Sequence, residues 1–167
     1  MAATCGGRSR FLLEVIEAIR GEWPSDLPLW VRLSCTDWVP GGLTVEDTVA
    51  VSAKLAATGL VDLIDCSSGG VSHEQKTPSL HPGYRVPFAD AIRNQAGIAT
   101  GAVGMITEPT HAAGIMANGR ADVVLARALL ADPAWPIRAA KALGVKPAVP
   151  KPYLRVALKS QPAVIAS

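Results

Sequence analysis

This sequence of 167 residues contains few aromatic residues, few cysteines and no excess of one charge, and each scarcity excludes a class of protein. Its 16 basic and 14 acidic residues are scattered without runs, and only 5% of its residues are aromatic, which argues against binding of nucleic acids. No apolar stretch reaches the ~18 residues that span a bilayer, and residues 1–10 lack the hydrophobic centre of a signal peptide. We therefore expect a cytoplasmic protein that binds neither nucleic acid nor membranes.

Residues that commonly bind metals or act as nucleophiles are scarce as well. The three cysteines show neither C-x-x-C nor Cys/His ligand spacing, which is typical of reduced thiols in a cytosolic protein. Nothing in the sequence marks a base beside Cys35 or Cys66, so buried thiols are favoured over nucleophiles. We expect no metal site, and we interpret the three histidines as exposed loop residues: His73, His81 and His111.

Hydrophobic residues make up 49% of the chain, and short apolar runs alternate with amphipathic stretches. Thr44, with Asp47 three residues later, predicts a capped helix start, and Gly59 predicts the end of that helix. Asp132 and Pro133 predict the start of the last helix. Strands are expected within 27–35, 61–70, 98–104 and 121–127, and helices within 8–24, 43–59, 84–97, 108–119 and 132–144.

Nearly continuous apolar strands separated by helices indicate a parallel sheet that helices cover. A doubly wound sheet and a barrel of strand–helix units both fit this order. A complete (β/α)8 barrel takes about 250 residues, so four units amount to half of one. The GAVG stretch at 101–104 is not the G-x-G-x-x-G pattern of dinucleotide-binding folds, which disfavours the doubly wound alternative.

Polar residues gather where the predicted strands end, and in both architectures these carboxyl ends meet. The small residues at 101–104 leave backbone N–H groups open to a ligand, and the guanidinium of Arg127 can bind two oxygens, which together indicate a phosphate site. The alternative is structural, with glycines that only form turns and an arginine in a surface ion pair. Arg32 lies within an apolar strand and needs a partner there, either a ligand anion or a carboxylate such as Asp65.

Seven segments follow one another from about Arg8 to about Arg155: RSRFLLEVIEAIR, LWVRLSCTDW, GLVDLIDCSSGG, HPGYRVPFADAIR, ATGAVGMIT, NGRADVVLARALLADPAWP and PYLR. Together they resemble the old yellow enzyme family, in particular its bacterial xenobiotic reductases and thermophilic-like ene-reductases. That family has a (β/α)8 barrel that holds FMN and passes hydride from NADPH or NADH through FMN to the β-carbon of α,β-unsaturated carbonyl compounds. The resemblance implies an α/β fold, the C-terminal half of a (β/α)8 TIM barrel with about four parallel strands and covering helices.

The resemblance also implies roles for five residues. Arg32 matches the arginine at the end of the family's fifth strand, beside the N1/C2-carbonyl edge of the flavin, where the reduced flavin is negatively charged. Val103 and Gly104 match the turn after the seventh strand, whose amides hold the FMN phosphate. Ala126 and Arg127 match the eighth-strand pair that also binds this phosphate.

The chain departs from the family at several points. The family's carbonyl-binding histidine pair and its tyrosine proton donor lie in the N-terminal half, so we assign no catalytic residue in this chain. Gly6 and Gly7 run straight into Arg8, which suggests a truncated, split or rearranged gene product. The 121–127 segment is one residue shorter than the family norm, which would reverse the facing of part of a strand or require a bulge.

We therefore divide the chain into an atypical segment 1–7, a partial TIM-barrel FMN-binding domain 8–146 and an extended, proline-rich tail 147–167. In the tail, Tyr153 and Arg155 match a family segment that can reach a neighbouring subunit's site. A half barrel leaves strand edges and inner side-chain layers without partners. We therefore expect association with the missing N-terminal half or formation of a homo-oligomer.

Two hypotheses of different classes follow. The first is a fragment of an FMN-dependent NAD(P)H ene-reductase that carries the FMN-phosphate half of the site and acts on small-molecule enones. The alternative is a non-catalytic remnant or partner-binding subunit that has lost FMN, which the shortened 121–127 segment and the missing catalytic half favour. A half barrel that binds phosphate esters and has its own chemistry is a third option.

Overall fold

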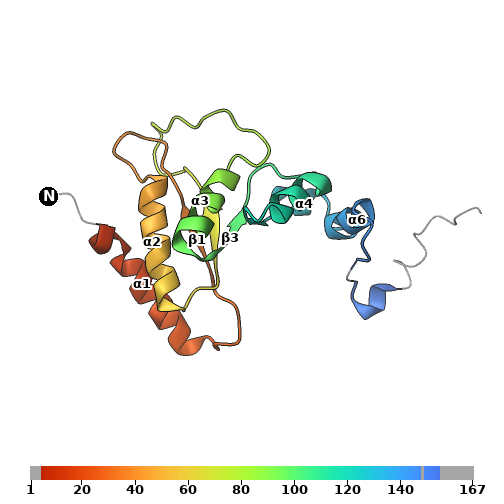
Figure 1. Ribbon diagram of the computed structural model, residues 1–167, viewed down its shortest axis with the longest axis horizontal. Coiled ribbons are helices and arrows are strands. Elements are labelled where there is room, and N and C mark those ends of the chain that lie inside the picture. The colour runs from red at the N-terminus through yellow and green to blue at the C-terminus, as the bar shows by residue number, and fades with distance from the viewer. Residues whose placement is uncertain (1–4, 148, 155–167) are drawn as a thin grey trace, which may run out of the picture.

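The computed structural model describes residues 5–147 and 149–154, and within them four strands alternate with helices (Figure 1). The strands are β1 (Trp30–Ser34), β2 (Leu63–Ser67), β3 (Ala99–Ala102) and β4 (Asp122–Val123). The helices are α1 (Cys5–Glu22), α2 (Val45–Thr58), α3 (Val86–Ala96), α4 (Pro109–Ala117), α5 (Arg127–Ala131) and α6 (Trp135–Ala142), followed by the short 3-10 helix η1 (Lys151–Tyr153).

The four strands form one parallel sheet in chain order, β1-β2-β3-β4. In the register of this sheet, Arg32 lies opposite Asp65, and Asp65 lies opposite Gly101. A doubly wound sheet reverses its strand order at a switch point, whereas consecutive strands of a (β/α)8 barrel are neighbours. The order of the described strands therefore matches the predicted partial barrel and not the doubly wound alternative.

The hydrophobic core lies between the sheet and the helices, with α1 beside α2 and α2 beside α3 (Figure 1). Ile64 and Cys66 point from β2 into this core and are fully buried, as is Leu55 of α2. The buried Thr100 of β3 donates a hydrogen bond from Oγ1 to the backbone oxygen of Ala89 in α3, at 3.1 Å. Because side chains alternate along a strand, the intervening residues face the other side of the sheet, which corresponds to the inside of a barrel.

Both ends of α2 confirm the prediction from the local sequence. Thr44 is the N-cap, since its Oγ1 accepts a hydrogen bond from the backbone N–H of Asp47 at 3.2 Å. Asp47 Oδ2 in turn accepts from the backbone N–H of Thr44 at 3.2 Å, which completes a capping box. Gly59 ends the helix in the left-handed conformation, with φ 65°.

The first strand is less buried than its sequence predicts. The apolar segment 27–35 predicts a strand of a covered sheet, but β1 lies at the edge of the described sheet. Because β1 has one neighbour among the described strands, Trp30 keeps 59% of its surface exposed. At this residue the expectation of a covered strand is wrong.

The last strand and the last long helix also differ from prediction. Only two residues of the predicted 121–127 strand pair with β3, and Arg127 begins α5 instead of ending a strand. The predicted helix start at Asp132 is wrong as well, because Asp132 accepts from the backbone N–H of Ala134 at 3.0 Å in a turn that follows α5. Helix α6 begins only at Trp135.

The ends of the chain are described in part. Helix α1 begins at Cys5, so the predicted atypical segment 1–7 is helical over its last residues. The predicted extended tail contains the turn of η1, while the side chain of Tyr153 and all of Arg155 lie outside what the structure describes. Among the described residues, no helix is long and apolar enough to cross a membrane.

Candidate functional site

A cavity of about 590 Å³, the strand-end cavity, opens at the carboxyl-terminal ends of the strands. Because parallel strands end at the same edge, residues far apart in the sequence meet there. The five residues for which the resemblance implies a cofactor role all line this one cavity: Arg32, Val103, Gly104, Ala126 and Arg127.

The lining of the strand-end cavity contains three arginines, and no described residue of the lining has a carboxylate side chain. Arg127 is exposed and forms no side-chain hydrogen bond or ion pair with any described residue. Arg85 is half-buried and has no carboxylate partner in the described part of the chain. The third is Arg32, which is paired. The cavity is therefore positively charged and suited to an anion.

Arg32 is held by Asp65, its neighbour in the β1–β2 register. Nε and Nη2 of Arg32 approach the same carboxylate oxygen, Asp65 Oδ2, at 2.6 and 2.5 Å. The side chain of Asp65 is 11% exposed and that of Arg32 is 57% exposed. The sequence left two possible partners for Arg32, a ligand anion or a carboxylate such as Asp65, and the structure shows the pair with Asp65. The ion pair fixes the guanidinium, while Nη1 keeps no partner among the described residues.

Gly104 turns the chain after β3 with φ 144°, a conformation that favours glycine. A Cβ atom at this position would lie 2.9 Å from Cε1 of Tyr84. The backbone oxygen of Gly104 also accepts from the N–H of Gly83 at 2.7 Å. The turn is thus locked against the segment that precedes α3, and it presents bare backbone to the strand-end cavity.

Arg127 reaches the strand-end cavity from a helix, not from a strand end. The backbone N–H of Val124 still donates to Ala102 at 3.0 Å, but strand pairing ends there. The chain then turns at Ala126, with φ −122° and ψ −88°, and α5 begins at Arg127. The 121–127 segment thus has a strand that ends early and is followed by this turn, and Arg127 still lines the cavity.

Among the charged and aromatic residues of the lining, two were missed from the sequence, Tyr84 and Arg85. Both stand at the end of the long loop between β2 and α3. A signal for them existed, because in a strand–helix unit the helix begins at the same edge at which the strand ends. A cation just before a predicted helix therefore belongs to the mouth of the sheet.

The two cysteines whose side chains the structure describes lie outside the strand-end cavity. Cys35 and Cys66 are fully buried, and they belong to the core on the helix-covered side of the sheet. A side-chain hydrogen bond with Cys35, together with burial, raises the pKa of the Cys66 thiol. Because the thiolate is the nucleophilic form, these observations confirm the interpretation as buried, inert thiols.

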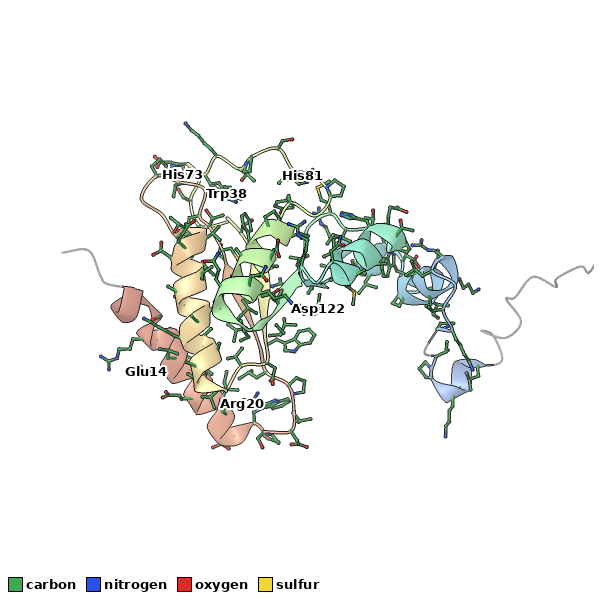
Figure 2. The ribbon with its side chains drawn as sticks, in the orientation of Figure 1. Glu14, Arg20, Trp38, His73, His81 and Asp122 are labelled. Atoms are coloured by element: carbon green, nitrogen blue, oxygen red, sulfur yellow. The ribbon has the colours of Figure 1, made fainter. Side chains whose placement is uncertain are left out.

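The histidines and Trp38 lie outside the strand-end cavity. His73 and His81 are exposed on the loop after β2, as predicted, at the same end of the molecule as Trp38 (Figure 2). His111 is half-buried on α4, so the interpretation as a loop residue is wrong for it. Trp38 packs against Phe88 with ring centroids 5.6 Å apart. In the described ranges, no three potential ligands gather into a metal site.

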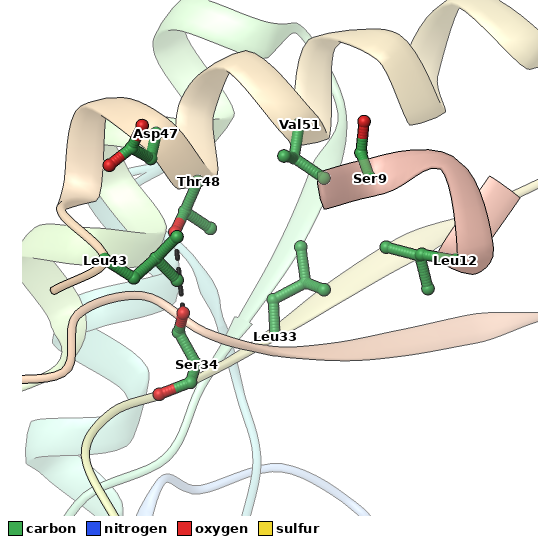
Figure 3. Close-up of a pocket in the computed structure, with 8 residues that line it drawn as sticks. All are labelled: Ser9, Leu12, Leu33, Ser34, Leu43, Asp47, Thr48 and Val51. Carbon is green, nitrogen blue, oxygen red and sulfur yellow. Dashed lines mark hydrogen bonds between the residues drawn. The ribbon is translucent and has the colours of Figure 1, made fainter. Parts of the chain in front are cut away.

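A smaller cavity of about 200 Å³ lies between α1, α2 and the end of β1 (Figure 3). Its walls are largely apolar, with Leu12 and Val51 on facing helices. Its polar groups are engaged in the fold, since Thr48 Oγ1 donates to the backbone oxygen of Ser34 and Asp47 belongs to the capping box. None of its described lining residues is cationic, so the strand-end cavity is the candidate site.

The sequence of this chain matches a family model and several curated proteins. The model of the NADH:flavin oxidoreductase / NADH oxidase family matches residues 5–145. The chain is 50% identical over 149 residues to an NADPH dehydrogenase of Geobacillus thermodenitrificans (strain NG80-2), covering 89% of this chain and 42% of that protein. It is 44% identical over 149 residues to an NADPH dehydrogenase of Bacillus subtilis (strain 168), covering 89% and 43%.

A solved structure gives the same picture of the fold. The chain resembles a 2-naphthoyl-CoA reductase in complex with 2-naphthoyl-CoA, with a TM-score of 0.70 and 28% sequence identity. The match covers 86% of this chain and 22% of that one. The chain thus spans about two fifths of the length of the curated relatives named above and a smaller share of this reductase.

The conformational constraint on the turn at Gly104 can be tested by its effect on the stability of the fold. We expect Gly104→Ala to destabilise the fold by about 1–3 kcal/mol, because the new methyl group meets Tyr84 in a backbone conformation unfavourable to alanine. Urea unfolding followed by circular dichroism measures the change. Gly114→Ala is the control, since Gly114 lies within α4 with open space around it, and we expect stabilisation by about 0.5–1 kcal/mol. Equal effects of the two substitutions would contradict a constrained turn.

Proposed function

Because this chain belongs to the NADH:flavin oxidoreductase / NADH oxidase family, we propose that its strand-end cavity binds FMN and that it forms part of an FMN-dependent NAD(P)H oxidoreductase. One observation carries the proposal. The five residues matched to the family's FMN contacts surround a single cavity that has three arginines and no carboxylate among its described lining residues. This set of donors fits the phosphate group at the ribityl end of FMN.

The described residues would hold the cofactor at two points. Arg127 would bind the phosphate with a guanidinium that has no partner among the described residues, beside the open backbone of Val103 and Gly104. Arg32 would lie against the N1/C2-carbonyl edge of the flavin. Asp65 orients Arg32 through their ion pair, so the positive charge at this edge is fixed in advance.

The chemistry itself would come from the cofactor, which when bound accepts hydride from NADPH or NADH and delivers it to the β-carbon of an α,β-unsaturated carbonyl compound. The substrates in this proposal are small enones. Several relatives are named NADPH dehydrogenases, which supports NADPH as the hydride donor. The part of this chain is to bind and orient the cofactor, and no proton transfer is assigned to its side chains.

We further propose that the open side of the half barrel binds the rest of a barrel. On this side, β1 has one neighbour and Trp30 is largely exposed. An apolar groove on α1 is lined by Val15, Ile19 and Trp23, and Phe11 is 77% exposed. A closed barrel has a further strand beside each edge strand and a further helix beside each outer helix. The curated relatives are more than twice as long as their matched parts, so the remaining strand–helix units are the proposed occupant.

A second candidate function is a non-catalytic remnant or partner-binding subunit that has lost FMN. The observation that favours it is the early end of β4, which leaves Arg127 on a five-residue helix instead of a strand end. The phosphate contact of the family would then be displaced. Binding of FMN separates this candidate from the first.

We expect the purified chain to quench flavin fluorescence saturably when FMN is titrated, and Arg127→Ala to weaken binding by about 1–3 kcal/mol, because a charged hydrogen-bond partner is lost. Arg120→Ala is the matched control. Arg120 pairs with Asp90 at the opposite end of β4, so FMN affinity should stay unchanged. Absence of binding at high micromolar FMN favours the remnant, and equal losses in the two variants would contradict the phosphate contact of Arg127.

The proposed partner is tested by adding the strand–helix units that this chain does not contain. We expect an N-terminal fragment of the Geobacillus relative to form a one-to-one complex with the chain, measured by size-exclusion chromatography with light scattering. The mixture, and neither piece alone, should oxidise NADPH when 2-cyclohexenone is added. A complex without activity would support a partner-binding subunit, and a homodimer that excludes the fragment would contradict the proposed occupant.

A further inference from the structure

Arg85 lines the strand-end cavity, and nothing in the family resemblance gives it a role. It stands at the start of α3, where its Nε donates to Ser68 Oγ at 3.0 Å and its Nη2 donates to the backbone oxygen of Ser68 at 3.2 Å. Its Cζ atom also lies 4.7 Å from the centre of the Tyr84 ring. Two hydrogen bonds and a ring contact therefore fix the guanidinium in place.

The hydrogen bonds to Ser68 leave most of the donors of Arg85 unused. A guanidinium has five N–H groups, so three remain after the two that Ser68 accepts. Arg85 is half-buried, and no described carboxylate pairs with it. A cation that is partly removed from water without a counter-ion costs free energy, and an anion in the cavity would offset this cost.

The position of Arg85 relative to the turn at Gly104 indicates which anion this is. The backbone nitrogen of Arg85 lies 3.7 Å from the point where a Cβ of Gly104 would stand. Gly83 is hydrogen-bonded to the same turn. Arg85 thus borders the turn that the proposed function gives to the phosphate, and Arg127 lines the same cavity from α5.

We propose that Arg85 is a phosphate-binding residue of the strand-end cavity and makes the site select FMN over riboflavin. The inference rests on the proposed function, since it names a further residue of the same site. A phosphate monoester is a dianion near neutral pH, and two arginines match this charge. Arg127 supplies one guanidinium from α5, and Arg85 supplies the other from the start of α3.

The test compares the affinities of FMN and riboflavin, which differ only in the phosphate, for the full chain and for R85Q. Glutamine is neutral but keeps an amide that can donate to Ser68. We expect R85Q to weaken FMN binding roughly tenfold to a hundredfold and to change riboflavin binding less than about twofold. R93Q is the matched control, because Arg93 lies at the other end of the same helix and pairs with Asp122; it should leave both affinities unchanged.

A second variant separates charge from positioning. S68A removes the hydroxyl that accepts from Arg85 and leaves the positive charge in the cavity. We expect S68A to retain most of the preference for FMN. If S68A loses this preference as completely as R85Q does, Arg85 acts by holding the loop after β2, and the inference is overturned.

The remaining outcomes distinguish this inference from the proposed function. If the unmodified chain binds FMN more tightly than riboflavin and R85Q keeps that preference, the role of Arg85 is wrong and the proposed function stands. If the unmodified chain binds FMN no better than riboflavin, the phosphate site itself is wrong, and both proposals fail. Circular dichroism of each variant, compared with that of the unmodified chain, shows that a lost preference reflects binding and not unfolding.

Discussion

Parallel pairing of the four strands in chain order is the constraint on which the site depends. It brings the ends of all four strands to one edge of the sheet, so that segments separated by up to about a hundred residues border one cavity. It also sets Arg32 opposite Asp65, which turns a charge inside an apolar strand into a fixed ion pair. The same pairing places Cys35, Cys66 and Ile64 on the helix-covered face. One face of the sheet thus forms the core, and the carboxyl-terminal ends of its strands border the candidate site.

The distribution of charge divides the strand-end cavity into two parts. Arg32 is neutralised by Asp65, whose second oxygen, Oδ1, is buried without a partner among the described residues. Arg85 and Arg127 have no such carboxylate in the described part of the chain, and they leave an excess of positive charge in the cavity that the turn at Gly104 borders. An asymmetric ligand with a dianionic end and a polar but less charged ring suits this arrangement. The proposed preference for flavin mononucleotide over an uncharged flavin rests on this asymmetry.

Local sequence predicted the elements whose ends are set by local chemistry. Thr44, Asp47 and Gly59 bound α2 as expected, since a capping box and a left-handed glycine need no distant partner. The exposure of Trp30 was not predictable in this way, because it depends on a strand that would pair with β1 and not on residues nearby. The start of α6 was misplaced because Asp132 forms a turn of its own instead of a cap. Arg85 was missed because its significance depends on the return of a long loop to the mouth of the sheet.

Binding of the FMN phosphate in the strand-end cavity can be followed in the phosphorus-31 spectrum of FMN titrated with the chain. We expect the phosphate resonance to shift or broaden as the chain is added, and we expect Arg127→Ala to need a higher protein concentration for the same change. If the ring fluorescence of FMN responds while its phosphate resonance stays at the free position, the proposed phosphate site is wrong. In that case the arginines of the cavity would bind something other than the cofactor phosphate.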